Sequence, residues 1–167
     1  MRYTLKIFLL TLAVIGSLIL TGCPKRSDIE TAAKVGFETT ARLRTAQNVV
    51  LELYRGGIVS LNAKDLFFDA AAKGWDVFEF YNDKVEETLR KIESGEVTTI
   101  TAKEIIRKIV SEQVVDVMNR IVTALNLMTP TKAEKLFGII RTVFAGVTKV
   151  LDVLSINSTV LVPIRQT

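Results

Sequence analysis

The chain has 167 residues, of which 49% are hydrophobic and 24% charged, a composition typical of one globular domain and too apolar for a wholly disordered chain. Removing Arg2 and Lys6, which lie in a segment that we expect to be cleaved off, leaves 20 of the 22 basic residues against 18 acidic ones. This near balance, without a concentrated basic stripe, gives no electrostatic basis for binding nucleic acid.

The chain has one cysteine and no histidine. A single cysteine cannot form an intrachain disulfide. Histidine is the side chain best suited to proton transfer near neutral pH and the commonest metal ligand. Its absence excludes the Glu-x-x-His pattern of di-iron helical bundles, and one cysteine cannot build a cysteine-rich zinc site. An all-carboxylate Mg²⁺ or Ca²⁺ site is the alternative, but the sequence contains no EF-hand loop, so we expect no metal and no cofactor.

The N-terminal segment has the pattern of a secretory signal. Arg2 and Lys6 precede an apolar stretch of about 15 residues, 7–21, which ends at Gly22-Cys23. A positive start, a short apolar stretch and a small residue before the cut are the three parts of such a signal. The apolar stretch is shorter than the roughly 20 residues that a helix needs to span a bilayer. We therefore predict a signal peptide over 1–22.

The sequence Leu20-Thr21-Gly22-Cys23 resembles the lipobox of bacterial lipoproteins. The resemblance implies transfer of a diacylglyceryl group to the Cys23 thiol, cleavage between Gly22 and Cys23, and acylation of the new amino terminus. Each buried CH₂ group contributes about 0.8 kcal/mol, and one acyl chain alone holds a protein only marginally, so two or more chains give stable anchoring. An uncleaved signal anchor with an incidental cysteine is the alternative.

Residues 23–26 form the predicted lipidated cysteine and a short tether. Pro24 stands where, in enterobacterial lipoproteins, an aspartate favours retention in the inner membrane. By that resemblance the outer membrane is favoured, provided that the cell has one. Lys25-Arg26 would be worth about 1 kcal/mol each beside anionic headgroups, but a solvated tether is the interpretation we favour.

Helical spacing of apolar residues predicts four helices, at about 27–55, 61–94, 101–128 and 130–155, followed by a tail over 156–167. Three of them begin at sequences of capping-box form, and the second begins near Ser60 or Asn62. Glycines or a proline follow the first three helices. The three capping boxes are Ser27-Asp28-Ile29-Glu30, Thr101-Ala102-Lys103-Glu104 and Thr131-Lys132-Ala133-Glu134.

The first two predicted helices each carry one apolar stripe, and Asn82 interrupts the second stripe. The first stripe consists of Ile29, Ala33, Phe37, Thr40, Leu43, Val50 and Leu53. The second consists of Phe68, Ala71, Trp75, Phe78, Val85, Leu89 and Ile92. The third and fourth predicted helices have wider apolar faces, and the β-branched residues of the third make a strand the competing prediction. Arg141, Lys149 and Asp152 argue against a membrane span in the fourth.

Four amphipathic helices of similar length with short connections predict an all-α fold, an elongated up-and-down four-helix bundle about 40 Å long. Two helical hairpins hinged near Gly95 are the alternative. The segment Thr159-Val160-Leu161-Val162 of the tail is expected to lie extended against the bundle.

The usual parts of an active site are missing from the sequence. It contains no G-x-S-x-G elbow, no phosphate-binding glycine loop and no histidine that would activate a serine. Glu86 and Glu87 are adjacent, so on a helix their side chains diverge and they do not form a catalytic pair. We therefore expect a protein that is not an enzyme.

Two surface features are open to a functional interpretation. Acidic residues follow one side of the second helix. They could form a docking site for a basic partner or for cations. We favour the alternative, a solvated helix face partly balanced by Lys73 and Lys84. The acidic residues are Asp65, Asp69, Asp76, Glu79, Asp83 and Glu86. The wide apolar faces of the last two helices indicate either a second buried surface, for an oligomer, a partner or a lipid, or a central place in the core, which we favour.

These features predict a non-enzymatic, lipid-anchored protein of the bacterial envelope that binds or scaffolds another envelope component. Its partners would be the membrane, through Cys23, and a second envelope protein or another copy of itself. A carrier of an apolar ligand or lipid held between the helices is one alternative. A phage-type exclusion or immunity lipoprotein is another.

Overall fold

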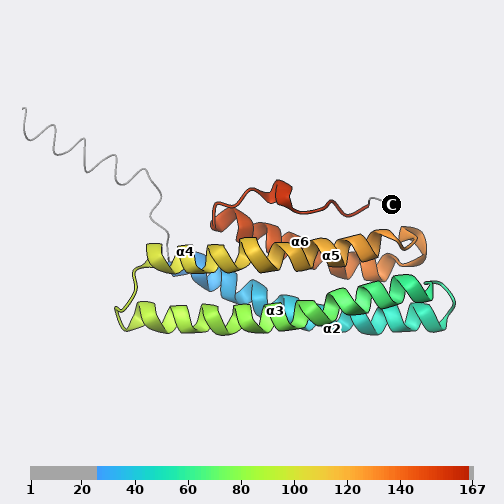
Figure 1. The fold of residues 1–167 in the computed structure, drawn as a ribbon, viewed down its shortest axis with the longest axis horizontal. Helices are drawn as coiled ribbons and strands as arrows, with labels where there is room; N and C mark the ends of the chain where they lie inside the picture. Colours follow the sequence, from blue (N-terminus) through green and yellow to red (C-terminus); the bar gives the residue numbers. More distant parts are fainter. Residues whose placement is uncertain (1–25, 166–167) are drawn as a thin grey trace, which may run out of the picture.

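The computed structural model describes residues 26–165, and within this range the protein is a bundle of long helices (Figure 1). The predicted signal peptide, the lipobox and Cys23 lie outside the described residues. The helices are α2 (Arg26–Arg55), α3 (Leu61–Glu93), α4 (Thr99–Ile109), α5 (Val115–Asn126) and α6 (Glu134–Val153). A π-helical segment, Val110–Val114, joins α4 to α5, so that the two form one continuous rod. Two 3₁₀ turns, Pro130–Lys132 and Ser158–Val160, flank α6.

The all-α, up-and-down prediction is confirmed. The helices run alternately in opposite directions, with the start of α2, the end of α3 and the start of α4 at one end of the bundle (Figure 1). The α2–α3 and α5–α6 connections lie at the other end. One hydrophobic core runs through all of the helices, which favours a single bundle over two hinged hairpins. Helix α2 packs along both α3 and α6, and α3 packs along α5.

Small residues bring α2 and α3 close together. The inward face of α2 is lined by Ala32, Gly36, Thr39 and Ala46, while the predicted stripe residue Phe37 is 50% exposed. The prediction was wrong there because it weighted bulk, whereas two close backbones leave room only for small side chains. On α3, a Cβ atom at Gly74 would lie 3.2 Å from Leu43 Cδ1.

The face of α3 is also rotated from the predicted stripe. Phe67 and Phe78 are fully enclosed, whereas Phe68 and Trp75 are only partly buried. The Trp75 Nε1–H donates to Gln47 Oε1 at 3.2 Å, which explains why the indole stays near the surface. The wide apolar faces predicted for the last two helices are mostly buried, but Ile105 is exposed and Phe144 is partly buried.

All three predicted capping boxes are wrong, whereas the start expected near Ser60 or Asn62 is confirmed, with Ser60 as the cap. Ser27 lies inside α2, and helix α4 begins one turn early because Thr98 accepts from the Thr101 N–H at 3.2 Å. The segment before α6 is a 3₁₀ turn that starts at Pro130, and α6 begins without a side-chain cap. Each S/T-x-x-E match therefore lay within a turn that another residue had already started.

Three helices end in the same way, with a residue in the left-handed conformation followed by a hydrogen bond back to the last turn. Gly57 (φ +69°) ends α2 and Gly95 (φ +77°) ends α3, as the sequence predicted. Helix α6 uses Ser155 at φ +58° for the same purpose. The Ile156 N–H donates to the Leu151 carbonyl at 2.8 Å, which closes this Schellman motif.

Candidate functional site

The predicted lipidation site precedes the described residues closely, since Cys23 is three residues before Arg26. Arg26 lies in the first turn of α2, at the end of the bundle where α3 also ends. Its Nε is 2.8 Å from Glu30 and its Nη2 is 2.6 Å from Glu93 of α3. The hydrogen bonds that Arg26 donates to Glu30 and then to Glu93 raise the pKa of Arg26. The chain therefore enters the bundle at one end, through a residue that is paired with two helices.

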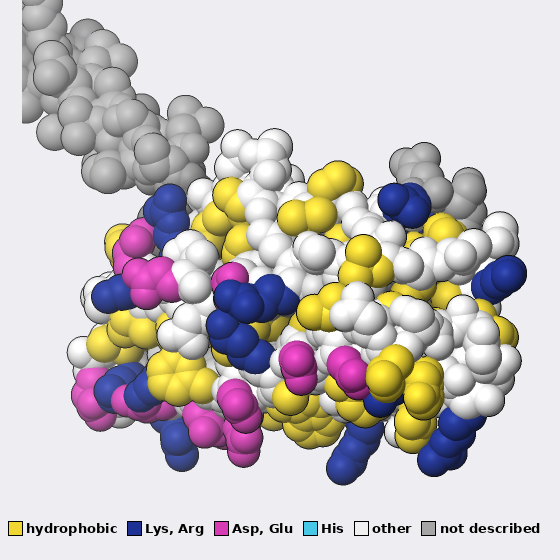
Figure 2. Space-filling model, turned by 45° about the vertical axis from the view of Figure 1, so that its right-hand side comes forward, with side chains coloured by type: hydrophobic (Ala, Val, Ile, Leu, Met, Phe, Trp, Pro, Cys, Tyr) yellow, Lys and Arg dark blue, Asp and Glu magenta, His cyan; other side chains and the backbone are white. Residues whose placement is uncertain are grey.

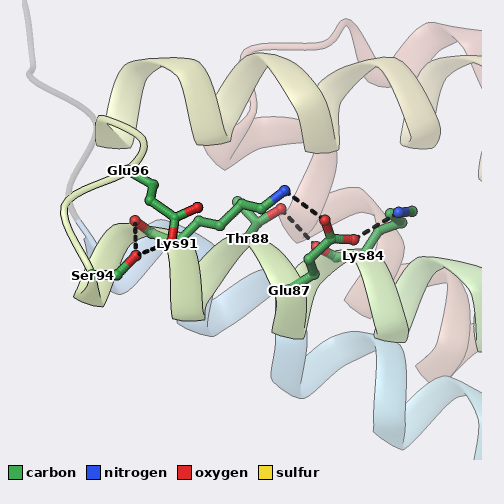
Figure 3. Close-up of polar contacts among 6 residues, drawn as sticks. All are labelled: Lys84, Glu87, Thr88, Lys91, Ser94 and Glu96. Carbon is green, nitrogen blue, oxygen red and sulfur yellow. Dashed lines mark hydrogen bonds and ion pairs between the residues drawn. The ribbon is translucent and has the colours of Figure 1, made fainter.

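A ladder of polar contacts continues along the last turns of α3 (Figure 3). Both carboxylate oxygens of Glu87 accept from lysines, at 2.6 Å from Lys84 Nζ and at 2.6 Å from Lys91 Nζ. These two hydrogen bonds lower the pKa of Glu87 to about 2. Beyond them, Ser94 donates to Glu96 at 2.9 Å in the connection to α4. A carboxylate held ionised in this way serves structure and not proton transfer near neutral pH.

The six acidic residues that the sequence places along one side of α3, from Asp65 to Glu86, are all exposed. Among residues 26–165 no group of three or more acidic or cysteine side chains could hold a metal ion. The two lysines expected to balance the acidic row pair elsewhere, since Lys84 binds Glu87 and Lys73 reaches Asp116 of α5. Lys64, which the sequence did not single out, pairs with Asp65 at 2.9 Å.

An open groove of about 600 Å³ lies between α3 and α5. Its charged part is a three-residue bridge in which Asp116 Oδ2 accepts from Lys73 Nζ at 3.1 Å and from Arg120 Nε at 2.9 Å. The hydrogen bonds from Arg120 and then Lys73 lower the pKa of Asp116. Its apolar part is formed by Leu66 and Leu127, both exposed. The charges are satisfied by one another, so the bridge ties α3 to α5 and leaves no activated group.

Charged and hydrophobic side chains are interspersed on the surface. Figure 2 shows acidic and basic side chains near one another at several places, with hydrophobic ones between them. Nine large hydrophobic side chains of the described residues are exposed, and they are spread over different elements from Phe37 on α2 to Val160 in the tail. Exposed apolar residues are normal on a protein surface and do not by themselves define an interface.

A second groove, along α5 and α6, is occupied by the tail of the chain, and the sequence did not single out its polar residues. Asn119 and Asn126 of α5 bind the tail backbone through their side-chain amides. Leu161 is buried beneath them. Two asparagines seven residues apart on α5 were the available signal. The predicted extended tail is confirmed from Leu161 onward, whereas Ser158–Val160 form a 3₁₀ turn.

The void at the contact of α2, α3 and α6 is small. A void of about 10 Å³ lies among Gly36, Phe78, Tyr81 and valines of the π-helical segment and α6. That is room for about one water, whereas small-molecule pockets measure about 300–1,000 Å³. A lipid chain would not fit at this place.

The described residues, 26–165, include no helix that has both the length and the apolar character needed to cross a membrane. Comparisons with protein-family models, with curated proteins and with solved structures found no match to this chain.

Proposed function

We propose that the protein is a lipid-anchored component of the bacterial envelope whose helical bundle binds or scaffolds another envelope component, without catalysis. The observation that carries the proposal is the sequence Leu20-Thr21-Gly22-Cys23 at the end of a signal-like segment. A thiol at this point, modified with acyl chains, would fasten the folded domain to a membrane.

The geometry of the bundle is compatible with such a tether. The described part of α2 starts at Arg26, three positions after Cys23 in the sequence. Arg26 is bound to Glu93 of α3, so the start of the described chain is paired with the end of α3. A helix of 30 residues at about 1.5 Å per residue would carry the opposite end about 45 Å away from the point of attachment.

The pairing of the charged groups favours a binding role over a catalytic one. Asp116 and Glu87, the carboxylates with the lowered pKa values, are each held by two cations. The core around Tyr81 is packed and its void is small. The described residues form a long surface of charged, polar and apolar side chains. It has an open groove between α3 and α5 and a second groove, along α5 and α6, that the tail of the chain occupies.

Fractionation of cells tests the anchoring part of the proposal. Cells that produce the full chain are compared with cells that produce Cys23→Ser, and both are separated into membrane and soluble fractions. The original chain should be found with membranes and be released by detergent but not by salt. The Cys23→Ser chain should remain a full-length precursor, because the processing enzyme for lipoproteins acts on the lipidated cysteine. Equal processing of both chains would reject the proposal.

Crosslinking in intact cells tests the binding part. A photoreactive residue at Leu127, in the α3–α5 groove, is compared with one at Thr142, an exposed position on α6. The proposal expects crosslinked envelope protein from one of these positions and none from the Cys23→Ser chain. Bound lipid in the purified protein without any protein crosslink would favour the carrier alternative instead.

A further inference from the structure

The last residues of the chain return along the bundle as an extended segment. After α6 the chain reverses at Ser155 and runs back beside α5 and α6 (Figure 1). Leu161 is 6% exposed, and Val162 and Ile164 pack against the core. The tail therefore contributes apolar side chains to a core that the helices leave open along this side.

Asn119 holds the backbone of the tail in the way that a neighbouring β-strand would. Its Nδ2 donates to the Val160 carbonyl at 2.9 Å, and its Oδ1 accepts from the Val162 N–H at 2.7 Å. One side-chain amide thus pairs both the carbonyl of one residue and the N–H of the second residue after it. Such pairing recognises an extended backbone whatever the side chains are.

Asn126 repeats the same pairing two helical turns further along α5. Its Nδ2 donates to the Pro163 carbonyl at 3.1 Å, and its Oδ1 accepts from the Arg165 N–H at 2.9 Å. Seven residues of helix rise about 10.5 Å, and three residues of extended chain cover about 10 Å. The two asparagines are therefore in register with every third residue of an extended peptide, and the buried Leu161 supplies an apolar anchor between the two tail residues that Asn119 pairs with.

The connection between α6 and the tail is short and strained. Ser155 adopts φ +58°, a conformation that glycine adopts at the corresponding ends of α2 and α3. Short hinge loops under strain favour the exchange of an element between identical chains, because opening the hinge relieves the strain while every other contact is made again.

We propose that the α5–α6 groove is an extended-peptide site that takes the tail of a second copy of this chain, so that two copies exchange tails. The second copy is the occupant that the contacts specify, since residues 160–165 already match the two asparagines and the apolar anchor. The inference rests on the proposed function in one respect: a membrane anchor would confine the copies and raise their effective concentration.

Complementary variants test the exchange with soluble chains that begin at Pro24 and carry no lipid. The first variant, Asn119→Ala/Asn126→Ala, keeps its tail but has a damaged groove. The second ends at Asn157, so it keeps the groove and the Schellman motif but has no tail. A tagged first variant should recover the second, whereas neither variant should pair with itself.

Two controls separate recognition from nonspecific association. Adding Leu161→Asp to the first variant should reduce recovery about tenfold or more, because it places a charge in an apolar site. Replacing the double substitution by Asn48→Ala, an exposed asparagine of α2, leaves the tail in its own groove and should lower recovery. Circular dichroism shows whether each variant is folded, and if the tail-less chain is unfolded, a labelled peptide of residues 158–167 is titrated against the Leu161→Asp full chain instead.

Sedimentation of the unmodified chain completes the test. A concentration-dependent dimer is expected, and Ser155→Gly should shift it toward the monomer because the hinge is no longer strained. Failure of the complementary variants to pair would overturn the proposed site. Pairing of the variants together with a strictly monomeric unmodified chain would overturn the exchange. Neither result bears on the lipid at Cys23, which these chains lack.

Discussion

The side-chain oxygen of Asn82, on α3, occupies the place where a Cβ atom would stand on Gly36 of α2. Asn82 Oδ1 is buried and accepts no hydrogen bond, while Asn82 Nδ2 donates to Thr40 Oγ1 at 3.4 Å. Thr40 in turn donates to the Gly36 carbonyl at 3.1 Å. Beside this group, Tyr81 donates to the Ala32 carbonyl at 2.8 Å. Two polar side chains inside an apolar core thus fix how α2 and α3 lie against each other, and only glycine at position 36 permits it.

Replacement of Gly36 by alanine should therefore destabilise the protein. The new methyl group would overlap Asn82 Oδ1 and lie 2.6 Å from Tyr81 Cε1. Overpacking of this kind costs about 1–3 kcal/mol. Gly138→Ala is the matched control, because it lies in α6 with no atom within 4 Å of the added carbon. The control should stabilise by about 0.5–1 kcal/mol. Urea unfolding measures both, and equal stabilisation by the two substitutions would contradict the packing described for Gly36.

Tyr81→Phe should lower the free energy of unfolding and reduce the loss of stability at alkaline pH. Loss of the hydrogen bond to Ala32 costs about 1 kcal/mol at neutral pH. Burial raises the pKa of the Tyr81 hydroxyl well above its ordinary value. The unfolded chain then releases this proton near pH 10 while the folded chain retains it, so stability falls as pH rises above about 10. Unfolding followed from pH 8 to 11 should show a smaller decline for Tyr81→Phe, and parallel curves would exclude Tyr81 as the cause.

Acid should remove the contribution that the hydrogen bonds from Lys84 and Lys91 to Glu87 make to stability. The pKa of Glu87 is lowered to about 2 by the hydrogen bonds from Lys84 and Lys91. A lowered carboxyl pKa stabilises the fold above the ordinary value, and this stabilisation is lost as pH falls from about 4.5 to about 2. Glu87→Gln should therefore show a smaller decrease in stability over that range than the unmodified chain. Glu86→Gln, an exposed neighbour outside the ladder, should behave like the unmodified chain. Equal slopes for all three chains would show that the ladder is not formed in solution.

Ser155→Gly should stabilise the monomer, since the left-handed conformation at the end of α6 is open to glycine without steric cost. A gain of about 0.5–1 kcal/mol is expected. Gly95→Ser is the reciprocal substitution, at φ +77° with no atom near the added carbon, and it should cost a similar amount. Thermal unfolding at low protein concentration measures both. Opposite signs support the assignment of strain to Ser155, whereas destabilisation by both would contradict it.

Much of the fold follows from the sequence because apolar residues recur at helical spacing and glycines stand where helices end. Gly57 and Gly95 lie at the predicted ends, and the stripe of α6 is buried as predicted. The residues that face inward on α2 and α3 were harder to predict, because small residues such as Ala32 and Gly36 contribute little to a hydrophobic pattern. Their importance lies in how closely two backbones approach, which depends on the partner helix.

The helix caps and the π-helical segment could not be predicted from short sequence patterns. A serine or threonine followed by glutamate is found inside helices as well as at their starts, and at α4 the cap came from Thr98 instead. The π-helical segment Val110–Val114 adds one residue to the turn, which lets adjacent positions on both sides of it face the core. The tail site depends on Asn119 and Asn126 meeting a segment about 40 residues away, and no local pattern of residues contains that information.

Intact-mass analysis of the protein purified from membranes tests the central claim most directly. We predict a chain that begins at Cys23 and carries a diacylglyceryl group on the thiol, with a further acyl group on the amino terminus. The tryptic peptide that contains Cys23 should be strongly retained on a reversed-phase column for the same reason. A free Cys23 thiol, or a chain that still begins at Met1, would contradict the anchoring of this helical bundle by lipid.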